Sequence, residues 1–309
     1  MRSALRAIEP AVSADERAIA RTVIYASLFD YPVTLRQLRA ALIESAQTEA
    51  EVLALYERSA WIRSIVAYER GFFFPVGRRE LIAVRSARET FSLHFLERHR
   101  TVLKLVGLLP FVRMVAISGS LAHFNLDGSG DLDLFVITRG RRVWTVTLAI
   151  VLLAKLLRCR KTVCANYVVA DTRLEVAQRD LFTANQIVHL KPIVGEDLLE
   201  AFVAANAFVT EYYPNYTAPP PLTPYGPGRL QPLKRIAEWL LAGPSLLVEP
   251  LSRRAYSWHL RRCSGSWQSP HQVSLEVDCV KLHTRSHRAP VLARFDAAVA
   301  EALGWDAAR

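Results

Sequence analysis

In residues 1–90, apolar positions recur with the spacing of three short helices and then of a hairpin. Ile19, Val23 and Ile24 share one stripe of a helix predicted over residues 14–29. Cap residues and a turn mark the elements that follow. The second helix begins at Thr34, the third begins at Thr48, and the hairpin is predicted over Ile62–Tyr68 and Phe72–Pro75.

This order of elements resembles a winged helix, a fold that often binds DNA. The third helix would enter the groove, but it carries Glu49, Glu51 and Glu57 against the single base Arg58. Affinity for duplex DNA depends on Lys and Arg contacts to phosphate, so this helix argues against binding DNA. We therefore expect a winged-helix-like domain that serves packing or protein contact.

Two apolar strands between residues 112 and 138 enclose a glycine-containing turn. The first strand ends in Gly119-Ser120, and the second presents Asp131 and Asp133. Strand side chains alternate between faces, so the two aspartates project together. Adjacent carboxylates repel each other unless a cation lies between them, and Mg²⁺ prefers such hard oxygen ligands.

The turn before the acids is suited to a phosphate. Glycine lets the backbone approach a ligand closely, and the start of a following helix offers unpaired N–H groups. A phosphate cradle beside two acids predicts nucleotidyl transfer. The alternative is a hairpin with two solvated aspartates.

Gly-Ser, ten intervening residues and Asp-x-Asp with apolar neighbours resemble the signature of the polymerase-β-type nucleotidyltransferase superfamily. The resemblance implies an α+β chain whose core is a mixed sheet flanked by helices. It also implies Gly119 and Ser120 as triphosphate contacts, with Asp131 and Asp133 as ligands of Mg²⁺ in a two-ion site. The implied enzyme moves a nucleoside monophosphate from an NTP to a hydroxyl and releases pyrophosphate. The acceptor stays open between a small molecule, a protein and RNA.

Many members of that superfamily carry a third acid on a neighbouring strand. The strand predicted over residues 162–170 offers Asn166 instead, which can ligate a metal or accept a hydrogen bond but is no useful base. Asp171 and Glu175 follow it and are candidates for the missing acid. Arg139 follows the acidic strand directly and is a candidate triphosphate contact. The alternative is that it lies in a solvated loop and contacts no ligand.

Two other functions stay open beside the enzyme. The first is a catalytically weak or inactive protein that binds nucleotide as a sensor or scaffold. The second is a nucleic-acid-binding regulator that uses the winged helix. Other landmarks are similar to a bacterial family of nucleotidyltransferase-domain proteins. They are Phe29-Asp-Tyr-Pro32, Cys164-Ala-Asn-Tyr167, Asn206 and Tyr213-Pro-Asn215.

Composition places limits on the class of protein. The 309 residues are 51% hydrophobic and include four cysteines without a Cys-x-x-Cys pair. Because no apolar signal segment begins the chain, we expect free thiols and a cytoplasmic location. The most membrane-like stretch, residues 143–157, is shorter than the roughly 20 residues that span a bilayer. It predicts a buried helix behind the sheet.

The net charge of +10 is concentrated towards the C-terminus, where residues 229–294 contain eleven Lys or Arg and four Asp or Glu. Such an excess suits RNA, DNA or peripheral contact with an anionic membrane surface. Lys281, His283 and Arg288 belong to a basic patch in this region that is a candidate anion contact.

A proline-rich stretch gives the clearest domain boundary. The expected parts are a winged-helix-like domain (1–90), a nucleotidyltransferase core (91–215), the linker (216–232) and a helical basic region (233–309).

Overall fold

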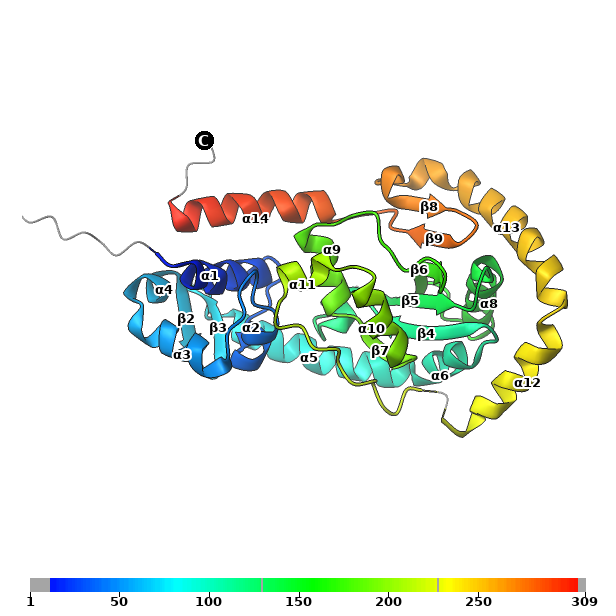
Figure 1. Cartoon of the computed structure of the whole chain (residues 1–309), viewed down its shortest axis with the longest axis horizontal. Coiled ribbons are helices and arrows are strands. Elements are labelled where there is room, and N and C mark those ends of the chain that lie inside the picture. The colour runs from blue at the N-terminus through cyan, green and yellow to red at the C-terminus, as the bar shows by residue number, and fades with distance from the viewer. Residues whose placement is uncertain (1–11, 129, 227, 305–309) are drawn as a thin grey trace, which may run out of the picture. The chain divides into compact units, whose positions relative to one another are not determined.

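The computed structural model describes residues 12–304 except 129 and 227. The chain divides into two compact units. The first contains the chain up to Ile82, residues 212–216 and the chain from Ala293 onward, and the second contains residues 83–211 and 217–292. Figure 1 labels the elements of both.

The first unit combines short helices with a small antiparallel sheet of order β1-β3-β2. Its elements include α1 (Ala14–Ser27), β1 (Val33–Thr34), α2 (Leu35–Ala40), α3 (Glu49–Arg58), α4 (Ala60–Ile65), β2 (Val66–Glu69) and β3 (Phe72–Pro75). Capping boxes begin three of the helices, with Ser13, Thr34 and Thr48 as the cap residues. The predicted starts at Thr34 and Thr48 are confirmed because each hydroxyl accepts a backbone N–H of the first turn.

The predicted hairpin is wrong in its first part, because residues 62–65 continue the helix α4. The Ser59 hydroxyl accepts the backbone N–H of Ile62 at 3.1 Å, which caps this helix. Ile62 is fully buried in the core of the unit. Only Val66–Glu69 then pairs with β3.

The segment around Asn215 belongs to this first unit although it lies far along the chain. The Asn215 side-chain amide donates to the carbonyls of Arg39 at 3.0 Å and Gln47 at 3.1 Å. The Glu44 N–H donates to the Tyr212 carbonyl at 2.8 Å. Asn215 therefore holds the ends of a loop that has few backbone partners of its own.

The second unit is built on a six-stranded sheet of order β7-β4-β5-β6-β9-β8. The strands are β4 (Val112–Ile117), β5 (Leu132–Thr138), β6 (Val163–Ala170), β7 (Lys191–Val194), β8 (Val273–Leu275) and β9 (Cys279–Leu282). β5 and β6 are parallel and the other pairs are antiparallel. An α+β chain with a mixed sheet flanked by helices is thus confirmed. The region expected to be helical contributes β8 and β9 to this sheet.

Helices cover both faces of the sheet. The helices that follow β3 along the chain include α5 (Leu81–Arg98), α6 (Arg100–Leu108), α7 (Gly119–Ala122), α8 (Val143–Leu156), α9 (Leu181–Val188), α10 (Glu196–Ala204), α11 (Phe208–Tyr212), α12 (Gln231–Leu241), α13 (Pro244–Arg262) and α14 (Arg288–Leu303). α6 and α8 pack on the face that carries Leu132, Leu134 and Val136. On the other face, the ring of Phe135 contacts that of Phe202 from α10, with 4.8 Å between centroids.

α8 is the helix predicted over residues 143–157, and its buried side packs behind the sheet as expected. Trp144 and Ile150 are among its buried residues. Among the helices of the described residues, none combines the length and the apolar character that crossing a membrane requires.

Candidate functional site

The end of β4 brings a glycine turn against the acidic strand. Ile117 lies opposite Leu134 in the antiparallel register, and the Ser118 N–H donates to the Asp133 carbonyl at 2.9 Å. Gly119 has φ +67°, a left-handed conformation that favours glycine. A Cβ on Gly119 would lie 2.7 Å from Oδ2 of Asp133, closer than real contacts allow. The carboxylate therefore lies directly over the turn, and only glycine leaves room for it.

Asp131 and Asp133 lie close enough for their negative charges to interact. Asp131 is exposed just before β5, whereas Asp133 is partly buried within the strand. Burial and the Asp131 charge raise the pKa of Asp133 to about 7, although a hydrogen bond from Asn166 opposes this shift. That hydrogen bond runs from Nδ2 of Asn166, on the neighbouring parallel strand, to Oδ1 of Asp133. The pair would gain from a bound cation.

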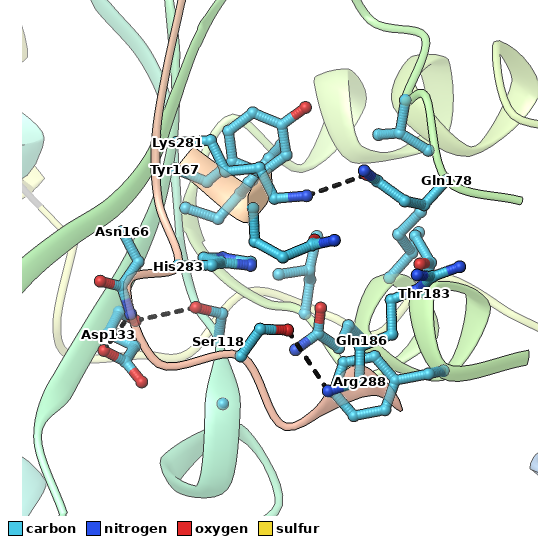
Figure 2. Close-up of a pocket in the computed structure, with 18 of the residues that line it drawn as sticks. Ser118, Asp133, Asn166, Tyr167, Gln178, Thr183, Gln186, Lys281, His283 and Arg288 are labelled. Carbon is cyan, nitrogen blue, oxygen red and sulfur yellow. Dashed lines mark hydrogen bonds between the residues drawn. The ribbon is translucent and has the colours of Figure 1, made fainter. Parts of the chain in front are cut away.

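A hollow opens beside Asp133 on the α9 and α10 side of the sheet. Its empty space is about 740 Å³, part of which is open to solvent. Figure 2 shows Ser118, Asp133 and Asn166 at one side of it. Further polar lining residues come from other segments, and they are Tyr167, Gln178, Thr183, Gln186, Gln272, Lys281, His283, Ser286 and Arg288.

Basic side chains reach the same hollow from β9 and from the residues that follow it (Figure 2). The ammonium group of Lys281 donates to Oε1 of Gln178 at 2.9 Å and lies 5.7 Å from the centroid of the Tyr167 ring. Burial lowers the pKa of Lys281. Burial and the charge of Lys281 lower the pKa of His283 to about 4. Part of the predicted basic patch thus faces the hollow that Asp133 lines.

Arg288 also lines the hollow, and its guanidinium pairs with the Asp180 carboxylate. Its charge is therefore partly compensated. Lys281, by contrast, has a neutral amide as its hydrogen-bond partner. Lys281 is the side chain in this wall best placed to meet a ligand's negative charge.

Several predicted residues lie elsewhere. Arg139 follows the far end of β5, and its guanidinium lies 3.4 Å from the Glu238 carboxylate. Asp171 lies at that same end, where it accepts the Gly140 N–H at 2.8 Å. Glu175 is exposed and lies 3.8 Å from Arg179. The structure does not bring these three to the hollow.

Asp131 and Ser120 are exposed neighbours of the hollow but do not line it. Throughout 12–304, with 129 and 227 left aside, no three His, Cys, Asp or Glu side chains cluster closely enough to hold a metal ion. The position considered for a third acid is occupied by Asn166, whose Oδ1 accepts from the Cys164 thiol at 2.7 Å. The acidic part of the site is therefore a pair.

The neutral lining residues Gln178, Thr183 and Gln186 carried no signal in the sequence. They lie in and before α9, which has the pattern of an ordinary buried helix. The signal that the sequence did contain for this wall of the hollow was the spacing of Lys281 and His283, which are two residues apart in a basic segment. The pairing of β9 with β6 brings these residues to the hollow, because it sets Lys281 opposite Tyr167.

The chain was compared with protein-family models, with curated proteins and with solved structures, and nothing among them matches it. The chemistry of this site is therefore inferred from its own residues. The hollow is lined by Asp133, a glycine turn and basic side chains, and Asp131 lies beside it. This arrangement suits a ligand with several phosphate charges and an associated divalent cation.

Proposed function

We propose that this chain is a Mg²⁺-dependent nucleotidyltransferase that moves a nucleoside monophosphate from an NTP to a hydroxyl of an acceptor and releases pyrophosphate. The contact between Gly119 and Asp133 carries the proposal. It places the glycine turn directly against a carboxylate that would gain from a bound cation. Lys281 and Arg288 line the same hollow, which adds positive charge for the rest of a triphosphate.

The residues present fit a magnesium ion that is shared with substrate. Asp131 and Asp133 would hold Mg²⁺, which in phosphate-handling sites is typically bound by one or two carboxylates together with phosphate oxygens and water. When bound, the ion supplies charge neutralisation at the transferred phosphoryl group. The raised pKa of Asp133 supports this assignment, because a carboxylate destabilised by burial and by a second acid gains most from a cation.

The protein's own groups then act by positioning. Asn166 fixes one oxygen of Asp133, which leaves Oδ2 on the side of the Gly119 turn. Lys281 would orient the outer phosphates by a charge-assisted hydrogen bond, for which its present partner, Gln178, is easily exchanged. Holding both reactants in line is the main contribution to such transfers.

A second candidate is a protein that binds nucleotide without turnover, as a sensor or scaffold. The observation that favours it is Asn166, because an amide at this position cannot accept the proton of the acceptor hydroxyl. The two candidates share the ligand and differ in product, so release of labelled pyrophosphate in the presence of acceptor extracts separates them.

Calorimetry with ATP, GTP, CTP and UTP, with and without Mg²⁺, tests the shared part. We expect Mg²⁺-dependent binding by the wild type and its loss in Asp131→Asn/Asp133→Asn. The matched control is Glu175→Gln/Asp197→Asn, which removes two exposed carboxylates outside the hollow. Thermal unfolding checks that both variants are folded. Absence of triphosphate binding by the folded wild type would refute both candidates.

A further inference from the structure

α12 packs on the second unit through charged side chains. The Lys234 ammonium donates to the Gly107 carbonyl at 2.9 Å and to the Val112 carbonyl. One oxygen of Glu238 accepts the backbone N–H of Phe111 at 2.9 Å. Lys234 and Glu238 are both buried. The inward side of this helix is therefore polar, and its charges satisfy backbone groups around the start of β4.

α13 does the same at the start of α8. The two oxygens of Glu249 accept the backbone N–H groups of Trp144 at 2.9 Å and Thr145 at 2.8 Å. This carboxylate caps the first turn of a helix whose own N-cap residue makes no capping hydrogen bond through its side chain. Ser245 and Ser252 are buried on the same inward side. Both helices thus bury a set of polar side chains, including both of their acids, against the protein.

The outward side of these helices carries many large apolar side chains. Trp239 is 78% exposed, and Leu247 is 73% exposed. Leu233, Ile236, Leu246 and Leu251 are each more than half exposed as well. We name the exposed surface of α12 and α13 the outer face. Figure 1 shows the two helices running along the margin of the second unit. A gathering of exposed large apolar side chains on two neighbouring helices is typical of an interaction site.

The charges on the outer face are all positive. Arg235, Arg253, Arg254, Arg261 and Arg262 are exposed on these two helices. The acids of α12 and α13 are Glu238 and Glu249, and both are buried on the inward side. An apolar surface interspersed with arginine is complementary to an anionic one.

Two further features of α13 combine apolar or aromatic surface with positive charge. The Arg262 guanidinium lies 4.0 Å from the centroid of the exposed Trp258 ring. A hollow between α8 and α13 is bordered by Lys155, Arg160 and His259. Tryptophan is enriched at the headgroup level of a bilayer, and long arginine side chains can extend their charge to the same level.

We propose that the outer face lies on an anionic lipid bilayer, with its leucines and tryptophans in the boundary between headgroups and acyl chains and its arginines at the anionic headgroups. A second copy of the chain fits this surface poorly, because face-to-face pairing would bring two sets of arginines together. This inference is independent of the proposed nucleotidyl transfer.

Flotation with vesicles tests the proposal on the full chain. Phosphatidylcholine vesicles with about one third phosphatidylglycerol should carry the protein, and pure phosphatidylcholine vesicles should carry far less. Leu246→Ser/Leu247→Ser should lower the partition coefficient by roughly 10- to 100-fold, because two apolar side chains no longer enter the interface. Phe91→Ser/Leu93→Ser, a matched change of exposed apolar residues on α5, should leave binding unchanged.

The electrostatic part has its own variant pair. Arg253→Glu/Arg254→Glu should weaken binding to the anionic vesicles by at least ~30-fold. Arg36→Glu/Arg58→Glu changes exposed arginines of the first unit by the same charge and should have little effect. Asp131→Asn/Asp133→Asn should float like the wild type, so a failed active-site proposal does not imitate a failed membrane proposal.

Several outcomes would overturn the inference. One is a folded wild type that does not float with the anionic vesicles. Another is equal flotation of wild type and Leu246→Ser/Leu247→Ser. In analytical ultracentrifugation without lipid, a wild-type dimer that this variant converts to monomer would assign the outer face to a second copy. RNA binding without flotation would assign the arginines to nucleic acid.

Discussion

Replacing Gly119 with alanine tests the geometry on which the candidate site depends. The residue has φ +67°, and an added Cβ would lie 2.7 Å from Oδ2 of Asp133. An L-residue in the left-handed region costs about 1–2 kcal/mol. The carboxylate must also move, and because Asn166 holds its other oxygen, this movement breaks that hydrogen bond. We expect both a loss of stability and a disproportionate loss of ligand binding.

A matched glycine separates the two effects. Gly71 in the β2–β3 turn has φ +83°, and nothing lies within 4 Å of its added Cβ. Gly71→Ala should therefore lose about 1–2 kcal/mol of unfolding free energy through backbone strain alone. Gly119→Ala should lose at least as much and should also weaken Mg²⁺-nucleotide binding by about tenfold or more, since the displaced carboxylate no longer meets the cation in its original position.

Urea unfolding gives the stabilities of the two glycine variants, and calorimetry gives their nucleotide affinities. The reasoning fails if Gly119→Ala binds the Mg²⁺-nucleotide as tightly as Gly71→Ala does. In that case Asp133 is free to rotate away without consequence, and the close approach at Gly119 has no bearing on function.

Three other changes probe the same unit. Asn166→Asp should lower the unfolding free energy by about 1–3 kcal/mol without Mg²⁺, because a third charge joins the acids, and added Mg²⁺ should restore it in thermal unfolding. Lys281→Met should weaken triphosphate binding about tenfold or more in calorimetry, against little change for the nucleoside. Burial lowers the pKa of His189 to about 4, against about 6.5 in the unfolded chain. Its neutral ring thus contributes stability that is present above pH 6.5 and is lost as pH falls towards 4. This loss, up to about 3 kcal/mol, should be smaller in His189→Phe when urea unfolding is followed against pH.

Local patterns in the sequence were enough to predict the two strands that bring the glycine turn and Asp133 together. The end of β4 at Ile117 and the course of β5 follow from alternation, and Leu132 and Leu134 occupy the buried face opposite Asp133 as expected. The helix start at Thr48 follows from its capping residues. Such features depend on neighbours a few residues away, which a single sequence contains.

Long-range pairing accounts for what the sequence did not indicate. Arg139 follows Asp133 closely in sequence but lies at the other end of β5, because an extended strand carries the chain away at ~3.3 Å per residue. Lys281 lies far along the chain, and β9 brings it to the same hollow. Distance along a strand could have excluded Arg139 in advance. No local pattern could have chosen β9 as the neighbour of β6.

α12 illustrates a different limit of the sequence. Its apolar positions recur with the spacing of one side of a helix, which is the pattern of an amphipathic helix. This pattern does not say which side of the helix faces the protein. The usual rule turns the apolar side inward. Here Glu238 and Lys234 are buried instead, because the chain near β4 exposes a backbone N–H and two carbonyls that they satisfy. A helix whose polar side is held by specific hydrogen bonds can leave its apolar side exposed to solvent. Exposed apolar side chains are what a helix needs in order to bind the surface of a lipid bilayer.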